Sequence, residues 1–150
     1  MRRAAIIVLL LVVDASGCDP GWSYRPTRPD PNRTGDYEID GASAHMFAGS
    51  LEVRLTLRNV GLTPLSVDPE QVRVVDARGH ELPRRLLAPA STEHVVYKVL
   101  RGTSLDLAGA FRVDPGHRPF FNRDLRTITI AVDVTGRGGA QVLQTSLDRT

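Results

Sequence analysis

The residue types that could support catalysis or metal binding are scattered along this chain. No two of the four histidines are two or four positions apart, and no cysteine lies near them: they are His45, His80, His94 and His117. Metal sites need several ligands that converge at a fixed distance. The sequence also has no Gly-x-Ser-x-Gly elbow, no phosphate-binding glycine loop and no recognisable carboxylate pair. We therefore expect no metal, no cofactor and no enzymatic activity.

The single cysteine, Cys18, follows a short hydrophobic leader. Arg2 and Arg3 come first, and a ten-residue apolar run follows from Ala4 to Val13. Ten helical residues span about 15 Å, which is half of a bilayer core, so this run predicts a signal peptide rather than a transmembrane helix. We expect residues 1–17 to be removed and the chain to be exported.

The four residues Ala15-Ser16-Gly17-Cys18 resemble the lipobox of bacterial lipoproteins. The resemblance implies that Cys18 is diacylated, becomes the mature N-terminus and anchors the protein to a membrane of the cell envelope through palmitate-type lipid. Asp19 resembles an inner-membrane retention signal, but the choice of membrane is left open. The alternative is an ordinary signal peptide with Cys18 as a free thiol. A lone thiol in an oxidising compartment is a reactive liability, which acylation removes.

The charge pattern argues against a nucleic-acid partner. The whole chain has 19 basic and 17 acidic residues. Removal of residues 1–17 takes away two arginines and one aspartate, which leaves 17 basic and 16 acidic residues and a net charge of +1. The two signs are interspersed, so no basic stripe remains to follow a phosphate backbone.

Residues 18–35 have the composition of a tether that precedes a domain over residues 36–150. The segment carries four prolines among polar residues and no periodic apolar pattern: Pro20, Pro26, Pro29 and Pro31. Such a chain favours an extended polyproline-like form and could hold a domain up to roughly 50 Å from the lipid. Trp22 and Tyr24 have two interpretations. They lie at the membrane interface, or they fold back on the domain.

The clearest structural pattern is the stretch from Ser50 to Asn59. Its residues alternate strictly between apolar and polar, with Leu51, Val53, Leu55 and Leu57 as the apolar set. A period of two places the apolar set on one face of an extended strand and the polar set on the other. A strand with one buried and one solvated face is typical of an antiparallel sheet.

Similar short segments recur along the chain, with turn residues between them. The expected strands cover residues 37–39 with a continuation at 44–47, then 50–59, 65–68 followed by 71–76, 93–100, the less regular 103–113, 126–134 and 140–147, with a short edge piece at 81–87. No stretch has a convincing helical period. About seven or eight strands at this spacing predict an all-β fold, namely an immunoglobulin-like antiparallel β-sandwich.

One part of the chain resembles bacterial lipoproteins with an immunoglobulin-like domain of unknown function. The resemblance runs from Arg58-Asn59-Val60-Gly61 through Pro64-Leu65-Ser66-Val67 to Val72-Arg73-Val74-Val75-Asp76-Ala77-Arg78-Gly79. These motifs are strand ends and turns, and they cover roughly residues 50–134. The resemblance implies a fold and an envelope location, and it brings no catalytic residue.

Three classes of function follow from these observations. The leading one is a non-catalytic envelope lipoprotein whose β-sandwich binds a protein partner or supports an envelope assembly. A glycan- or small-molecule-binding sandwich is the second, although aromatic residues are scarce at 5%. An enzyme is the third.

The loop from Asp114 to Asp124 is the longest segment of the body without a regular period, and loops on rigid sandwiches often carry binding residues. We expect one of two adjacent rings to form an anchor with a neighbouring arginine. The residues concerned are Arg118, Phe120, Phe121 and Arg123. The alternative is that both rings cap the open end of the sandwich.

Overall fold

The computed structural model describes residues 21–28, 32–85, 95–113 and 123–150 of the chain. These residues form nine β-strands and one short 3-10 helix, η2. The strands are β1 Trp22–Pro26, β2 Asn32–Thr34, β3 Tyr37–Phe47, β4 Ser50–Asn59, β5 Leu65–Val75, β6 Tyr97–Val99, β7 Ser104–Arg112, β8 Thr127–Gly136 and β9 Gly139–Arg149, and η2 covers Arg123–Leu125. The prediction of an all-β antiparallel fold is confirmed.

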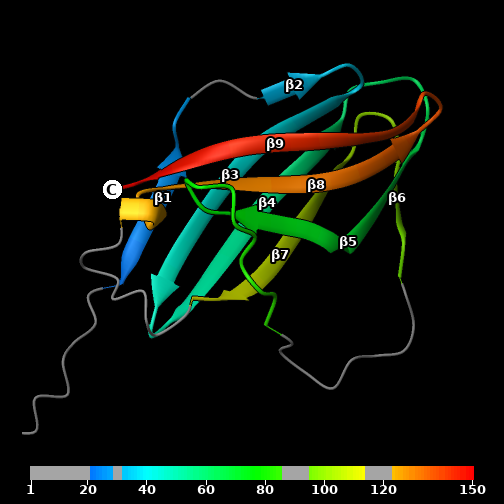
Figure 1. Cartoon of the computed structure of the whole chain (residues 1–150). Coiled ribbons are helices and arrows are strands. Elements are labelled where there is room, and N and C mark those ends of the chain that lie inside the picture. Colours follow the sequence, from blue (N-terminus) through cyan, green and yellow to red (C-terminus); the bar gives the residue numbers. More distant parts are fainter. Residues whose placement is uncertain (1–20, 29–31, 86–94, 114–122) are drawn as a thin grey trace, which may run out of the picture.

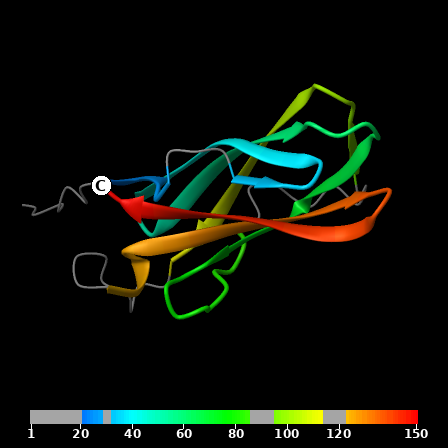
Figure 2. The same ribbon diagram turned by 90° about the horizontal axis from the view of Figure 1, so that it is seen from above.

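The strands form one antiparallel sheet in the order β6-β5-β8-β9-β1-β3-β4-β7, with β2 added beside β3. The sheet curls until its two ends approach, which gives a nearly closed, barrel-like shape (Figures 1 and 2). The finer prediction of an immunoglobulin-like sandwich is not confirmed, because the two halves of the sheet are continuous through β1.

A short segment after β5 closes the barrel at one end. The Leu82 amide donates a hydrogen bond to the Val74 carbonyl of β5, and the Arg85 amide donates to Ala110 of β7. Arg112 of β7 donates in return to the carbonyl of Pro83. Residues 81–85 therefore join β5 to β7 at this end of the barrel. Pro83 fits there because its missing amide hydrogen is not needed for a continuous ladder.

The core lies inside the curled sheet and follows the alternation that the sequence shows. In β4 the apolar set is buried and most of the intervening residues are exposed. The same period holds in β8, where Ile128, Ile130, Val132 and Val134 are fully buried. Burial of one such side chain contributes about 1.5–3 kcal/mol. The polar set of β4 forms the outer face of the sheet beside β3 and β7.

The segment expected to be a free tether is partly a component of the sheet. Strand β1 lies between β3 and β9, with Trp22 opposite Met46 and Tyr24 opposite Arg149. Tyr24 is 1% exposed, and its hydroxyl donates a 2.9 Å hydrogen bond to the buried carbonyl of Leu125. The prediction of a tether over residues 18–35 is wrong for this part, and the domain begins by Trp22. Trp22 and Tyr24 thus fold back on the domain, because β1 fills the position between β3 and β9 in the sheet.

Asn59, at the end of β4, is a fully buried polar residue whose hydrogen bonds join three segments. Its side-chain amide donates to the carbonyl oxygens of Thr63 at 2.8 Å and Val99 at 2.9 Å. Its side-chain oxygen accepts from the Gly61 amide at 2.9 Å. Its backbone also bonds to Thr103 and Gly102. The side chain thus fixes the turn after β4 and strand β6, and the backbone of the same residue fixes the turn from β6 to β7.

The barrel has two ends that are built from different turns. The β1 end contains the start of β1, the turn between β3 and β4, the end of β7 and η2. The Asn59 end contains the turns at residues 60–64, 100–103 and 136–139. Figure 1 shows these two ends at opposite sides of the molecule.

Candidate functional site

The first candidate site is an apolar surface at the Asn59 end, which we call the β6 surface. It consists of five large hydrophobic residues that are exposed: Leu62, Val95, Val96, Tyr97 and Leu100. Leu62 is 75% exposed and Leu100 is 57% exposed. Large side chains exposed in sequence-adjacent positions on a soluble domain often mark an interaction site.

Local structure explains why these side chains are held outward. Only Val99 of this segment is buried, where it pairs with Leu65 of β5. The following turn is closed by Thr103, whose amide and hydroxyl both donate to the Leu100 carbonyl, and Gly102 adopts a φ of 73° there. Asn59 fixes the backbone on both sides of the surface, through Thr63 and Val99. Hydrogen bonds therefore fix the backbone next to Leu62, Tyr97 and Leu100.

Strand β6 also offers backbone hydrogen-bonding groups. It stands at the end of the strand order, and among the described residues it pairs only with β5. An edge strand carries amide and carbonyl groups that point away from its one neighbour, and these can pair with a strand of another chain. The β6 surface thus combines an open edge with exposed apolar side chains.

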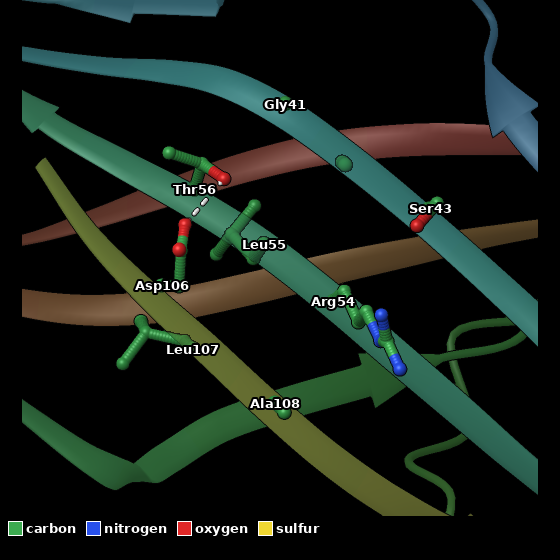
Figure 3. A pocket seen from close by; sticks show the side chains of 9 residues that line it. Gly41, Ser43, Arg54, Leu55, Thr56, Asp106, Leu107 and Ala108 are labelled. Carbon is green, nitrogen blue, oxygen red and sulfur yellow. Dashed lines mark hydrogen bonds between the residues drawn. The ribbon is translucent and has the colours of Figure 1, made fainter.

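The second candidate site is a shallow hollow on the outer face of β3, β4 and β7 (Figure 3). Thr56 of β4 donates a 2.8 Å hydrogen bond to Asp106 of β7, and the exposed Arg54 lies two residues away on the same face. The hollow has a volume of about 660 Å³. It exists because its outer-face neighbours are small: Gly41, Ser43 and Ala108.

The chemistry of this hollow is that of a binding surface. Arg54 offers a guanidinium for an anionic group, and Thr56 offers a hydroxyl that is already bonded. Its lining contains no histidine, cysteine or aromatic ring. The hydroxyl–carboxylate pair in the lining, Thr56 and Asp106, has no histidine beside it, and the lining offers no ring on which a sugar could stack.

The histidines described by the structure do not form a metal site. His45 is exposed, and His80 lies in a turn beside the buried carboxylate of Asp76. No group of three or more potential ligands occurs in the described parts of the chain. His94 and His117 lie outside those parts.

Asp76 organises a tight turn after β5. Its Oδ1 accepts hydrogen bonds from the amides of Arg78 at 2.8 Å and His80 at 2.9 Å. Burial alone would raise the pKa of Asp76, but these hydrogen bonds and the nearby His80 imidazole outweigh burial and hold that pKa below its usual range. Gly79 takes the positive φ that the turn requires. The Asp76–His80 contact is thus part of a turn.

Most of the site residues predicted from the sequence lie outside the described residues. These are Cys18, Arg118, Phe120 and Phe121. Arg123 begins helix η2, whose backbone is described. The predicted arginine–aromatic anchor and the lipidation of Cys18 stay predictions.

The β6 surface was missed in the sequence because an alternating pattern was assumed to have one buried face. Val95, Tyr97 and Val99 would share one face of a strand over residues 93–100, and only Val99 of the three is buried. The signal that could have revealed the surface is the uninterrupted run Val95-Val96-Tyr97, which gives a strand apolar side chains on both faces.

No helix in the described residues is long and apolar enough to cross a membrane. Comparison with known proteins assigns no family. No protein-family model matches the sequence, and no curated protein matches it. A solved structure, the X-ray structure of Northeast Structural Genomics Consortium target SoR45, aligns over 87% of this chain and 80% of its own, with 10% sequence identity and a TM-score of 0.35. A likeness at this level supports no conclusion about function.

Proposed function

We propose that this protein is an exported, non-catalytic envelope lipoprotein, acylated at Cys18, whose β-domain binds a protein partner through the β6 surface. The lipoprotein part is supported by the hydrophobic leader and by the lipobox-like Ala15-Ser16-Gly17-Cys18. The binding part rests on one observation. Three exposed apolar side chains flank an edge strand, Tyr97 is exposed within it, and Leu62 is exposed on the neighbouring turn.

The pairing pattern supports an immunoglobulin-like relationship for the domain. Strands β3, β4 and β7 are neighbours, and β9, β8 and β5 are neighbours with β6 beside β5. In chain order these groups correspond to the A-B-E and G-F-C groups of an immunoglobulin-like sandwich. Strand β1 then bridges the two groups by pairing with both β3 and β9.

Strand addition is the binding mode that fits the β6 surface. In that mode a segment of the partner pairs with the open edge, and backbone hydrogen bonds give affinity while side-chain pockets give specificity. The partner segment should be extended and apolar, because Val96 and Leu100 offer hydrophobic contacts and only Lys98 offers a charge. A segment with an acidic residue opposite Lys98 is the best match.

Site-specific photo-crosslinking in the native envelope tests this function. A crosslinking amino acid replaces Val96 or Leu100 in separate variants, and the control replaces Val142, which is 48% exposed on β9. We expect one discrete adduct from the two β6 positions and none from Val142. Equal adduct patterns at all three positions would show that the β6 surface has no partner of its own.

The lipid anchor is tested independently of the partner. Intact-mass measurement and detergent partitioning are compared between the wild type and Cys18→Ser. We expect the wild type to carry the mass of a diacylglyceryl group and to enter the detergent phase. A water-soluble wild type with a free thiol would contradict the lipoprotein assignment.

The hollow around Arg54 supports a second candidate, the binding of a small anionic ligand. Thermal shift measurements with phosphate and with carboxylated sugars, on the wild type and Arg54→Ala, test it. Stabilisation of the wild type alone supports this candidate. Equal shifts, or none, count against it.

A further inference from the structure

The distance between the proposed lipid and the folded body is very short. Strand β1 begins at Trp22, and Gly21 already packs on the end of β3, where an added Cβ would lie 2.7 Å from the His45 ring and 3.3 Å from the Met46 carbonyl. Only Asp19 and Pro20 separate Gly21 from Cys18. Three Cα–Cα steps span at most about 11 Å. A body joined to lipid at Cys18 therefore stays within that distance of it.

The structural element next to Gly21 is the turn between β3 and β4. Trp22 pairs with Met46, so Gly21 lies beside Phe47, the last residue of β3. Phe47 is 58% exposed, and the next two residues of the turn, Ala48 and Gly49, are exposed as well. The tip of this hairpin is thus apolar and stands at the end of the barrel from which the anchor emerges.

The turn residues add to this observation. Ala48 has a φ of 48° and Gly49 a φ of 73°, so both central residues of this two-residue hairpin have positive φ. Asparagine or aspartate is strongly preferred at the first of these positions, because alanine is disfavoured at positive φ. The chain places an apolar residue where a polar one is easier to accommodate, which suits a turn that contacts lipid.

The surroundings of the turn are cationic. Arg112 pairs with Ser50 at the base of the hairpin and is exposed, and Arg149 stacks over the Trp22 ring at 4.1 Å. Arg126, also at the β1 end, is exposed. Of the described carboxylates there, Asp124 is held by Arg78 at 2.8 Å, Asp76 lies in its turn, Asp148 accepts from Thr127, Glu81 is exposed, and the exposed Glu52 lines a hollow with Phe47 and Arg85. Exposed arginines beside an apolar tip match an anionic lipid surface.

We propose that the β1 end of the barrel rests on the membrane, with the Phe47 turn inserted at the level of the headgroups of anionic phospholipid. This proposal rests on the proposed acylation of Cys18. It fixes the orientation of the domain, since the Asn59 end and the β6 surface then point away from the bilayer. The partner of the β6 surface is reached from the aqueous side.

The only tryptophan of the chain provides the probe. Trp22 lies at the β1 end, so its fluorescence reports on contact between that end and lipid. The mature protein is reconstituted into vesicles of phosphatidylethanolamine and phosphatidylglycerol that contain a lipid brominated near the headgroup. The variants are Phe47→Ser and, as a matched control at the opposite end, Leu62→Ser. Leu62 is 75% exposed, so neither change is expected to disturb the core.

We expect Trp22 in the wild type and in Leu62→Ser to be quenched equally, and Phe47→Ser to lose about half of that quenching because the turn no longer holds the barrel end in the interface. Absence of quenching in the wild type would overturn the proposal, since the domain would then stand away from the lipid. Unchanged quenching in Phe47→Ser would overturn the role of the turn.

A failure of the proposed acylation can be told apart from a failure of the proposed orientation. Intact-mass measurement shows whether Cys18 carries an acyl group before any vesicle is prepared. If Cys18 carries none, the lipoprotein assignment is wrong, whatever the orientation of the domain. The geometry is then tested by coupling the Cys18 thiol to a maleimide-bearing phospholipid and repeating the quenching measurement.

Discussion

Replacement of Asn59 by alanine is the most informative single test of how this fold is held together. The side chain is 0% exposed and makes three hydrogen bonds, two as donor and one as acceptor, all between 2.8 and 2.9 Å. A hydrogen bond of this kind contributes about 1 kcal/mol net, and each buried partner left without a bond costs about 1–3 kcal/mol. The loss in free energy of unfolding should therefore be about 3 kcal/mol or more. That is a large part of the stability of a domain of this size.

Urea unfolding of the soluble Cys18→Ser chain measures this loss. The control is Thr56→Ala, which removes one exposed hydrogen bond to Asp106 on the outer face of the sheet and should cost within about 1 kcal/mol. If Asn59→Ala destabilises no more than Thr56→Ala, the idea that Asn59 holds β6 and its neighbouring turns in place is refuted.

The variant Asn59→Asp, which introduces a carboxyl group at the same position, provides a second test of these hydrogen bonds. Asn59→Asp keeps the acceptor for the Gly61 amide but turns the donor into an oxygen that faces the carbonyls of Thr63 and Val99. Burial and these carbonyls should raise the folded-state pKa of the new carboxyl above its unfolded value. The protonated form then favours folding, so the variant should lose stability as pH rises from its unfolded pKa through its folded pKa. A stability that rises over this pH interval would contradict the geometry.

Three further predictions concern single residues. Leu55→Ala should destabilise by about 2–5 kcal/mol in the same urea assay, because Leu55 is 3% exposed; a loss as small as that of Thr56→Ala would mean that β4 is not packed as described. Burial raises the pKa of Tyr24 from 10.0 to about 12, so the wild type should lose stability between pH 10 and pH 12, whereas Tyr24→Phe should lack this loss and cost about 1 kcal/mol at neutral pH for the bond to Leu125. The pKa of Asp76 is lowered in the folded state, so its contribution is present above its ordinary pKa and lost as pH falls through the folded value. Asp76→Asn should therefore show a flatter acid-side stability profile than the wild type, and identical profiles would count against the turn described for Asp76.

The positions of strands could be predicted well where one face of the strand is buried and the other is exposed to solvent. Strands β4 and β8 follow a period of two in sequence and in burial. Strand β7 is less regular because Ala110 and Phe111 are both buried, although neighbouring strand residues point to opposite faces. The backbone of residues 83–85 pairs with the edge of β7 at this position. The second edge neighbour of Ala110 is thus a segment whose pairing with β7 depends on tertiary contacts.

The domain boundary could not be predicted for a related reason. Prolines dominate the composition of residues 18–35, whereas pairing of β1 depends on partners more than 20 and 120 residues away, such as Met46 and Arg149. The composition of residues 18–35 does not indicate which distant strands these residues pair with. The same limit applies to the candidate sites, because the open edge of β6 is a property of strand order and is visible only when the sheet is assembled.

The position of β1 has a consequence for the time course of folding. This strand is the first of the sheet to be made, yet one of its two partners is β9, the last strand of the sequence. Contacts between residues so distant in sequence form slowly, since a long loop must close before they form. During synthesis, β1 can pair with β3 early, but its other edge stays open until β9 has been made. An unpaired edge of this kind is prone to pair with other chains. The arrival of β9 therefore ends an interval in which one edge of β1 is exposed to such pairing.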